Sequence, residues 1–535
     1  MTSSRRDFLR TAAAGVACAG ALRSAGGDSL IEVLAGEPVA TIAPQIYGHF
    51  VENLGGVVYD GIWVGEDSPV PNIGGLRKDL VEALRRVSPA VIRWPGGCFA
   101  DSYDWRDGIG PRGKRPRRTN FWAGAGEWPK GARRNGPQSY DPNQFGTVEF
   151  ARFCKAVGAQ PYFAANMRGS TALEFNHWVE YCNSPAGATT LADQRAADGE
   201  RDPLNVRYWG VGNEAWGCGG NFTPEDYATE FLRFTAWVPG YNVPLAFVGS
   251  GPNANDTDWT RRFFAKVAEK GALGGMWGWS MHHYAWNASG GRTTDWVAGK
   301  GDALKFDAGQ YYEILREASL MESFIANHWA AMRERDPQHH VKLVVDEWGA
   351  WYAPGTEPFG EALLGQQSTM RDAVLAGITL DTFNRNADKV GMAAVAQLVN
   401  CLQSLFFAHE DKFCVTPTYH VFDMYAAHQG AQSVRTLVDA PASYKGLAGL
   451  SCSASLRGKA LTVTITNPSL DQTREGDIGI RGGSVASAKS IVLAAADAHA
   501  HNSFENPRAV EPRTEQGVAH RFPPASVTKL EIQLV

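Results

Sequence analysis

Short apolar runs alternate with longer helical patterns along most of the chain, from about residue 46 to about residue 425. This alternation is typical of repeated βα units around a parallel sheet. Eight of the runs are candidate strands: residues 46–50, 90–94, 160–165, 208–212, 245–249, 276–281, 341–346 and 392–399. Eight parallel strands close a (β/α)8 TIM barrel, so an α/β fold of this type is predicted.

The pattern changes after about residue 430. Apolar residues there alternate in steps of two, as in 461–466 and 529–535, and Gly, Pro and Asn separate the runs. Such runs predict a C-terminal antiparallel β-sandwich, jelly-roll-like in kind. Residues 30–42 also have the pattern of a strand and a turn, and we expect them to join the sandwich. The predicted organisation is a signal peptide (1–27), an N-terminal strand segment joining the sandwich (28–45), a catalytic barrel (46–428) and the sandwich (429–535).

The first residues resemble an export signal. Arg5 and Arg6 precede a short apolar run over residues 11–22, the arrangement of a bacterial twin-arginine signal peptide. The run is too short for a transmembrane helix, and no other stretch is long and apolar enough for one. We therefore expect a periplasmic or secreted protein that has no membrane association once the signal is removed.

The composition argues against nucleic acid and anionic membranes as binding partners. The chain has 535 residues, 44% hydrophobic and 20% charged, with a net charge of −5. That balance supplies no field for binding nucleic acid or an anionic membrane. The 17 Trp and 25 Phe residues suit either a large core or the stacking of neutral sugars. Several Trp residues lie in motifs expected at or near the barrel mouth: Trp94, Trp105, Trp209, Trp216, Trp279 and Trp348.

The cysteines do not form an obvious set. Of eight, Cys18 lies in the predicted signal, which leaves the odd number of seven. No C-x-x-C spacing occurs, so neither a zinc ribbon nor a thioredoxin-like motif is indicated. We expect most of these thiols to be small buried side chains and the fold to be independent of disulfides.

Two glutamates follow strong apolar runs. Glu214 ends the fourth predicted strand and Glu347 the seventh, and the C-terminal ends of barrel strands converge on the active face. Cleavage of a glycosidic bond needs two carboxyl groups, one to protonate the leaving oxygen and one to attack or to activate water. A single Glu after a strand is usually a solvated loop residue; the pair on these two strands is far more specific.

Around these glutamates the sequence is similar to glycoside hydrolase family 51, the α-L-arabinofuranosidases. The similarity covers nearly the whole chain after the signal and lies in residues 46–52, 93–101, 103–111, 208–220 and 416–420. It implies a retaining exo-glycosidase that removes terminal α-L-arabinofuranosyl residues from arabinoxylan, arabinan or arabino-oligosaccharides. It implies no cofactor, and by analogy a homo-oligomer, trimer or hexamer. No metal is expected, because the pairs His282–His283 and His339–His340 are adjacent and no His-Glu-x-x-His motif occurs.

The resemblance assigns roles residue by residue. Glu347 is expected to be the nucleophile and Glu214 the acid/base. Glu52 is expected to hydrogen-bond sugar hydroxyls, and Arg93 to keep Glu347 ionised. Asn213 is expected to bond the 2-hydroxyl.

Further positions line the expected pocket. The run 280–284 matches a Ser-x-His-x-Tyr pattern, which makes His282 and Tyr284 substrate-binding candidates. Neighbouring His283 points the other way in a continuing strand and is expected to be structural. Trp122 and Trp348 are candidate pocket walls, although Trp is more often a core residue.

The sequence departs from the family pattern at two places. Cys98 stands where many members have Asn, so an amide contact to the sugar is replaced by a weak thiol donor. Many members also have a Gln after strand eight, in the region that reads Lys-Phe-Cys-Val-Thr-Pro over 412–417 here. Both departures concern contacts to sugar hydroxyls and the preferred sugar, and both leave the carboxylates unaffected.

The predicted fold is compatible with three other functions. The same scaffold suits an endo-β-glucanase or a β-xylosidase, since a fold does not determine a substrate. A non-catalytic carbohydrate-binding protein is a further alternative, which the presence of both glutamates disfavours. The polar segment 112–141 is longer than a structural connection needs and is expected to cover a site.

Overall fold

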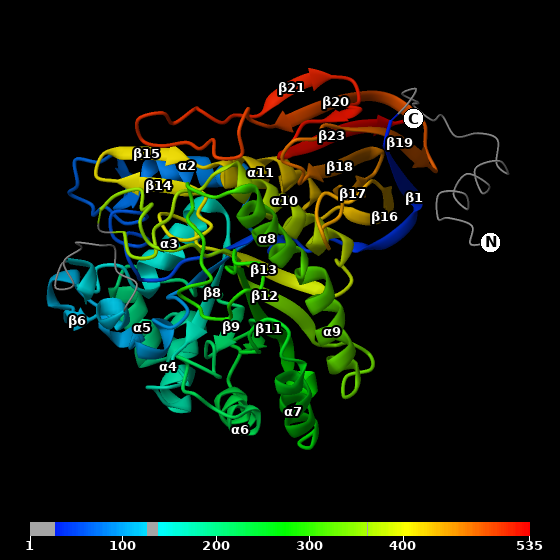
Figure 1. Cartoon of the computed structure of the whole chain (residues 1–535). Helices are drawn as coiled ribbons and strands as arrows, with labels where there is room; N and C mark the ends of the chain where they lie inside the picture. The colour runs from blue at the N-terminus through cyan, green and yellow to red at the C-terminus, as the bar shows by residue number, and fades with distance from the viewer. Residues whose placement is uncertain (1–26, 126–136, 361) are drawn as a thin grey trace.

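A computed structural model describes residues 27–125, 137–360 and 362–535 of the chain. The predicted signal peptide, apart from its last residue, lies outside the described residues. Figure 1 shows a barrel with surrounding helices, and the C-terminal strands gathered at one side of it. None of the helices in the described ranges combines the length and the apolar character needed to cross a membrane.

Eight parallel strands form a closed barrel, and the predicted fold class is confirmed. In hydrogen-bonded order they are β10, β11, β12, β13, β2, β5, β8 and β9. Their bounds in chain order are β2 Gly48–Phe50, β5 Val91–Trp94, β8 Gln160–Ala165, β9 Tyr208–Val211, β10 Ala246–Gly249, β11 Met276–Ala285, β12 Lys342–Ala350 and β13 Val390–Ala396. All eight predicted strands are present, with β11 and β12 extending several residues beyond their predicted ends.

Helices surround the barrel, and local chemistry sets many of their ends. Thr223 caps α6 by accepting a hydrogen bond from the Asp226 N–H, and Pro224 takes the first helical position. Leu320 separates α8 from α9 and acts as the C-cap of the first and the N-cap of the second. The helices are α2 Lys78–Val87, α3 Thr147–Val157, α4 Ala172–Asn183, α5 Thr190–Ala197, α6 Pro224–Thr235, α7 Thr257–Ala268, α8 Ala308–Ser319, α9 Met321–Arg333, α10 Met370–Arg385 and α11 Pro417–Tyr425.

Most of the tryptophans expected at the barrel mouth belong to the core. Trp94, Trp209, Trp279 and Trp348 are each at most 1% exposed. Trp279 stacks on Phe263 of α7 with ring centroids 4.2 Å apart. Trp residues next to inward-pointing strand positions face outward, because successive side chains of a strand alternate. The aromatic surplus therefore mainly fills the layer between barrel and helices.

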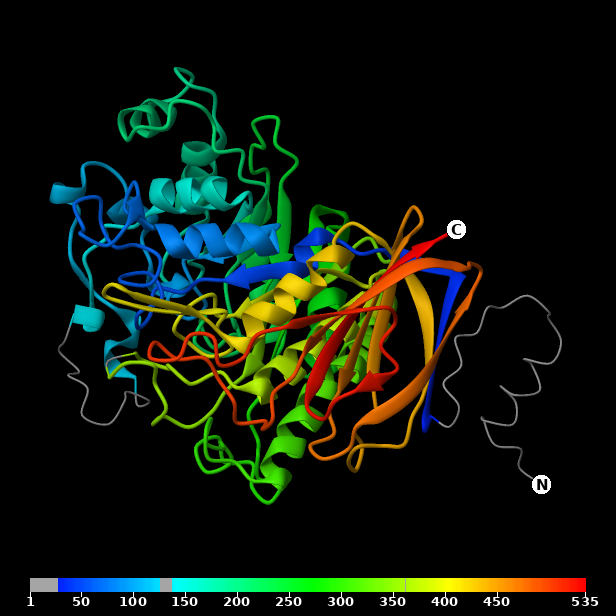
Figure 2. The same ribbon diagram turned by 90° about the horizontal axis from the view of Figure 1, so that it is seen from above.

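The C-terminal strands form one nine-stranded sheet in the order β21, β20, β23, β18, β17, β16, β1, β19 and β22. The N-terminal strand β1 pairs antiparallel with β16 and parallel with β19. Figure 2 shows this sheet wrapped beside the barrel, with β1 on its far side. The bounds are β1 Ser29–Thr41, β16 Gln432–Asp439, β17 Ser451–Arg457, β18 Ala460–Asn467, β19 Arg474–Arg481, β20 Val485–Leu493, β21 Arg513–Gln516, β22 Arg521–Phe522 and β23 Ser526–Leu534.

One helix joins the two parts. Helix α10 packs against the barrel strand β12 and also against β16, β17, β18 and β23 of the sheet. Every residue of α10 from Met370 to Asn384 is buried. The remaining strands form two-stranded antiparallel sheets in the connections: β3 Asn72–Ile73 with β4 Leu76–Arg77, β6 Arg118–Thr119 with β7 Tyr140–Asp141, and β14 Phe406–His409 with β15 Lys412–Val415.

Candidate active site

The two predicted glutamates meet at one end of the barrel. Glu347 lies within β12, and Glu214 follows the end of β9 by three residues. One oxygen of each carboxyl group and a ring nitrogen of His282 all lie within 4.8 Å of one another. Retaining glycosidases hold their two carboxyl groups about 5–5.5 Å apart and inverting enzymes about 6.5–9.5 Å apart. The separation here fits direct attack by one carboxylate.

Glu347 is held by donors on both oxygens. Arg93 Nη1 donates to Oε1 at 2.7 Å, and Tyr284 Oη donates to Oε2 at 2.8 Å. Glu347 is 6% exposed. Burial raises the pKa of Glu347, and so does the charge of Glu214, while the positive charges of His282 and Arg93 oppose that rise.

His282 bridges the acidic groups. Its Nδ1 lies 2.9 Å from Glu214 Oε1 and 3.5 Å from Glu347 Oε2, and its Nε2 lies 3.2 Å from Asp346 Oδ1. Burial alone lowers the pKa of His282, but Glu347, Asp346 and Glu214 together raise it to about 10. A ring with this pKa is a cation at neutral pH, which can hydrogen-bond Glu214 through Nδ1 and form an ion pair with Asp346 through Nε2.

Asp346 belongs to this network although sequence reasoning did not select it. It is 2% exposed and accepts a hydrogen bond from Tyr162 Oη at 2.8 Å. Burial raises its pKa, but Arg93 and His282 lower it more, so the pKa ends below the usual range for Asp. The only sequence feature that could have identified Asp346 is its position directly before Glu347.

Arg93 connects the nucleophile to Asn213. Besides Glu347, it donates from Nη2 to Asn213 Oδ1 at 2.6 Å. The buried carboxylate of Asp101 accepts from the Asn213 N–H at 3.1 Å and from the Met167 N–H at 2.8 Å. Because Arg93 fixes the oxygen of the Asn213 amide, the NH2 end of that amide is the one left to donate.

Glu52 lies beside the same pocket. Its Oε1 accepts from the Gly97 and Phe99 N–H groups at 3.1 and 2.9 Å, and its Oε2 from Gln397 Nε2 at 3.2 Å. Burial, and then the charge of Glu347, raises the pKa of Glu52 to about 8. A hydrogen bond from the Trp122 side chain opposes that rise, which puts Trp122 next to Glu52.

A glutamine does follow the eighth barrel strand, at Gln397. The sequence placed this position in 412–417, but those residues form β15 and the start of α11. Gln397 directly follows β13, and its Oε1 also accepts from the Glu52 N–H at 2.9 Å. It lies inside a predicted strand, so only the pairing of β13 with β2 identifies it.

Gly97 lets backbone approach the nucleophile. A Cβ at this position would lie 2.8 Å from Glu347 Oε1 and 3.3 Å from the Asn213 amide nitrogen. Both contacts are too short, so any side chain here would displace groups of the site. Glycine is required at Gly97 for a packing reason, not for its conformational freedom.

Glu214 occupies a less crowded place. Its backbone adopts φ 41°, in the left-handed region that residues with a Cβ seldom occupy. The Gly217 and Gly219 N–H groups donate to its carbonyl at 2.7 and 3.2 Å. Its side chain is 19% exposed, against 8% for Glu347.

A disulfide joins Cys98 to Cys218 beside Glu214, which corrects two expectations. The sulfur atoms of Cys98 and Cys218 lie 3.9 and 3.6 Å from Glu214 Oε2. A disulfide sulfur carries no hydrogen, so Cys98 is not a thiol donor in this state. The partners are 120 residues apart, and only the approach of two strand ends reveals the pair. The other cysteines of the described residues are free and buried, as expected: Cys154, Cys182, Cys401, Cys414 and Cys452.

Trp348 does not line the pocket. It is 1% exposed and stacks on Phe422 of α11 at 6.2 Å, with Phe383 of α10 against its edge. Its side chain points to the opposite face of β12 from Glu347, because neighbouring residues of a strand alternate. His283 likewise points outward, where its Nε2 lies 2.8 Å from the Glu317 carbonyl oxygen.

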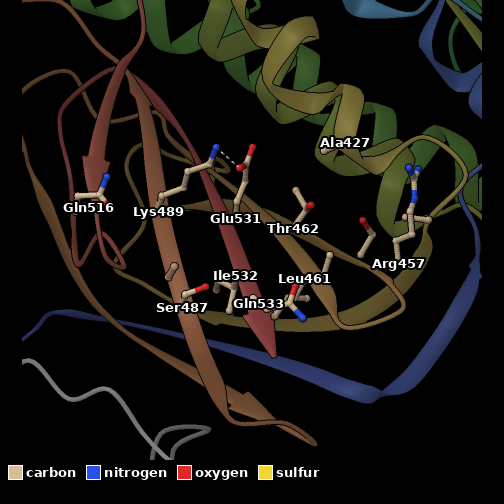
Figure 3. A pocket seen from close by; sticks show the side chains of 14 residues that line it. Ala427, Arg457, Leu461, Thr462, Ser487, Lys489, Gln516, Glu531, Ile532 and Gln533 are labelled. Atoms are coloured by element: carbon tan, nitrogen blue, oxygen red, sulfur yellow. Dashed lines mark ion pairs between the residues drawn. The ribbon is translucent and has the colours of Figure 1, made fainter. Parts of the chain in front are cut away.

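The described ends of the long 112–141 segment line a cavity. Asn120, Gln138 and Tyr140 border it together with Asn53, the residue after Glu52. Its volume is about 480 Å³. A separate hollow of about 550 Å³ lies on the C-terminal sheet (Figure 3), where Lys489 pairs with Glu531 at 2.6 Å and no aromatic side chain takes part. Neither Glu214 nor Glu347 is among the described residues that line these two hollows.

Known proteins match this chain over most of its length. The family model of the α-L-arabinofuranosidase 1 domain matches residues 83–288, and that of the α-L-arabinofuranosidase C-terminal domain matches residues 346–526. An intracellular exo-α-L-arabinofuranosidase of Bacteroides ovatus is 34% identical over 95% of this chain and 96% of its own. An intracellular exo-α-(1→5)-L-arabinofuranosidase of Streptomyces lividans is 29% identical over 90% of this chain and 71% of its own.

A solved structure matches over the same extent. The family 51 arabinofuranosidase of Xanthomonas axonopodis pv. citri superposes with a TM-score of 0.86 at 33% identity, covering 95% of this chain and all of that one. The relatives also correct one expectation. Those from Bacteroides ovatus and Streptomyces lividans are named intracellular, so the prediction of a periplasmic or secreted protein is wrong. A twin arginine before a short apolar run is too small a pattern to outweigh them.

Proposed function

The chain belongs to the α-L-arabinofuranosidases of glycoside hydrolase family 51, and we propose that Glu347 and Glu214 carry its reaction by double displacement. The observation that supports this most directly is the approach of the two carboxyl groups at the ends of β12 and β9. The spacing leaves room for the anomeric carbon and no room for an intervening water.

In the first step, Glu347 Oε attacks the anomeric carbon while protonated Glu214 gives its proton to the leaving oxygen. The bond to the aglycone breaks, and an ester joins the sugar to Glu347. In the second step, Glu214 as carboxylate takes a proton from water, whose oxygen displaces Glu347. Arabinose leaves with its original configuration.

The surrounding residues favour these roles. Arg93 and Tyr284 both donate to Glu347, which stabilises the anion before attack. His282 contacts both glutamates and can hold Glu214 in line with the leaving oxygen. Asn213 and Glu52 are the groups we assign to sugar hydroxyls, with Gln397 keeping Glu52 in place.

We infer terminal arabinofuranosyl groups of arabinan, arabinoxylan or their oligosaccharides as the substrate, and an intracellular compartment, as in the named relatives. Short oligosaccharides suit that compartment better than polymers do.

A panel of nitrophenyl glycosides tests the assignment. The purified protein should release nitrophenol from the α-L-arabinofuranoside at least about 100-fold faster than from the β-D-xyloside or β-D-glucoside, on the scale of one lost polar recognition group or more. Faster release from the xyloside, or cleavage of mixed-linkage glucan, would favour the alternative activities. Sugar binding without turnover would instead indicate a binding protein.

A further inference from the structure

The Cys98–Cys218 pair differs from every other cysteine of the described residues. Its sulfur atoms contact the carboxylate of Glu214, and both residues are partly exposed at the pocket. The remaining described cysteines are buried, and burial raises the pKa of each thiol. Only this pair combines access from solvent with a neighbouring oxygen ligand.

We propose that reduction of this disulfide creates a site for a soft divalent cation, Zn²⁺ or Cd²⁺, formed by Cys98, Cys218 and Glu214. One ligand atom from each of these residues lies within 4.8 Å of the others. Two thiolates and a carboxylate are ligands that zinc commonly takes, and a water in the fourth position completes a tetrahedral site.

The distances suit such a cation with a small rearrangement. Ligands around tetrahedral zinc lie roughly 3.3–3.8 Å apart, given metal–ligand bonds of about 2.0–2.3 Å. The two sulfur–oxygen distances of 3.9 and 3.6 Å are already close to that range. The sulfur atoms must separate once the bond between them is broken, and Cα atoms 5.5 Å apart leave space for this by side-chain rotation.

The negative charge around the proposed site favours binding of a cation. Three carboxyl groups other than the largely protonated Glu52 converge there, those of Glu214, Asp346 and Glu347, against the cations of Arg93 and His282. His282 is not counted as a ligand, because each of its nitrogens already forms an ion pair with a carboxylate. The site therefore has three protein ligands and an open position.

The chemistry balances with a dithiol as reductant. The dithiol supplies two electrons and two protons; the Cys98–Cys218 bond breaks, each sulfur takes one proton, and the reductant becomes a disulfide. Cation binding then releases both protons to solvent and involves no further electron transfer. Intracellular compartments keep thiols largely reduced, so the dithiol state is accessible there.

Inhibition follows from the ligand set and rests on the proposed role of Glu214. A carboxylate bound to Zn²⁺ cannot carry the proton that the leaving oxygen needs. Substrates with poor leaving groups should lose about 100-fold or more in turnover, the usual range for general acid catalysis. Aryl glycosides with good leaving groups should be inhibited less.

The test uses the full chain in two redox states. Protein reduced with a phosphine, then freed of it by gel filtration, is titrated with Cd²⁺ while the ultraviolet cadmium–thiolate charge-transfer band is recorded. The reduced protein should bind one Cd²⁺ per chain with this band, and the oxidised protein should show none. Equal signals from both states, or no signal from the reduced one, would overturn the proposal.

Variants locate the site. Cys98→Ser with Cys218→Ser should abolish the band, and Cys414→Ser, a buried cysteine elsewhere, should leave it unchanged; the reverse result would contradict the assignment. Glu214→Gln should weaken Cd²⁺ binding about tenfold, and unchanged binding would remove Glu214 from the ligand set. The comparison of the two redox states of the unaltered chain does not depend on any variant folding.

Activity measured in the same titration separates the two hypotheses. Inhibition that follows the band, and that a chelator reverses, supports both the metal site and Glu214 as acid. A band of one Cd²⁺ per chain without inhibition would contradict Glu214 as the acid while the metal site stands. Inhibition that is equal in the oxidised protein would place the inhibitory cation elsewhere.

Discussion

The surroundings of Glu347 and Glu214 differ sharply although their oxygens lie within 4.8 Å. Glu347 receives hydrogen bonds from Arg93 and Tyr284 on its two oxygens. Glu214 receives one from His282, and its other oxygen faces the sulfur atoms of a disulfide. Hydrogen-bond donors fix the carboxylate of Glu347, whereas the carboxylate of Glu214 is partly exposed to solvent.

This difference matches two kinds of chemical work. A nucleophile should stay ionised and still, and two donors with a neighbouring cation favour that state. An acid/base must gain and lose a proton in each cycle, so several fixed donors would hold it in one state. The environment of each carboxylate, and not its residue type, separates the roles.

The largest expected effect comes from removing the fixed carboxylate. Glu347→Ala should lower kcat by about 10⁴-fold or more, because no other group can form the covalent intermediate. Azide should restore part of the turnover and give a product of inverted configuration. The control is Glu82→Ala, on the exposed face of α2. Near-normal activity of Glu347→Ala would assign the nucleophile elsewhere.

Glu214→Ala should depend on the leaving group. With an alkyl arabinofuranoside the loss should be about 10²–10⁴-fold, because the departing alkoxide needs a proton. With an activated aryl glycoside the first step needs little help, so the loss should be much smaller. Equal losses on the two substrates, measured as kcat/KM, would contradict the role of Glu214 as acid.

Tyr284→Phe tests whether the donors to Glu347 matter. It removes one hydrogen bond to a buried carboxylate and should lower kcat/KM roughly 10- to 100-fold, since such bonds contribute about 1.5–3 kcal/mol. Tyr181→Phe is the matched control: its hydroxyl donates to Asp198 at 2.8 Å, in the outer helix layer. Similar losses in both variants would show an effect of stability alone.

His282→Gln should move the pH profile and lower the activity at the optimum roughly tenfold. The positive charge of His282 opposes the rise in the pKa of Glu347, so its removal raises that pKa further. Because Glu347 must be ionised to attack, the acid limb of kcat/KM should shift to higher pH. His283→Gln, whose side chain points to the other face of β11, should leave the limb in place. If the acid limb shifted in His283→Gln and not in His282→Gln, then His282 would not be the group that controls the pKa of Glu347.

His428 offers the smallest effect and the clearest contrast with His282. It is the last residue of η8 (Ala426–His428) and is buried against the sheet, where its ring hydrogen-bonds the hydroxyls of Ser455 and Thr464. Burial lowers its pKa to about 3, where carboxylates raise that of His282. Its stabilising contribution is complete above the ordinary pKa of about 6.5 and declines as the pH falls toward 3.

The unfolding free energy should therefore decrease by about 2 kcal/mol from this group between pH 7 and pH 5. His428→Asn should be less stable at pH 7 and lose less on acidification, as followed by thermal unfolding. His340→Asn, with a side chain 70% exposed, should retain the pH dependence of the original chain. An unchanged slope in His428→Asn would show that other groups set the acid sensitivity.

Local patterns along the chain predict much of this molecule. The alternation of apolar runs and helical segments identifies all eight barrel strands, because a strand buried on both faces must be apolar throughout. The positions of Glu214 and Glu347 follow from the same runs, since the end of a barrel strand is where a polar side chain reaches the active face. Arg93, Asn213, His282 and Tyr284 come from motifs around those ends.

Contacts between distant segments are what the tertiary structure decided. The Cys98–Cys218 pair, the bond from Gln397 to Glu52 and the place of Asp346 each join residues brought together only by closure of the barrel. Trp348 was misplaced because hydrophobicity does not tell which face of a strand a side chain takes until its neighbours are known. The pKa values of Glu52 and His282 likewise depend on burial and on charges from other strands. Sequence determined the elements and the chemistry available at their ends; the closed barrel decided which of those groups act on one another.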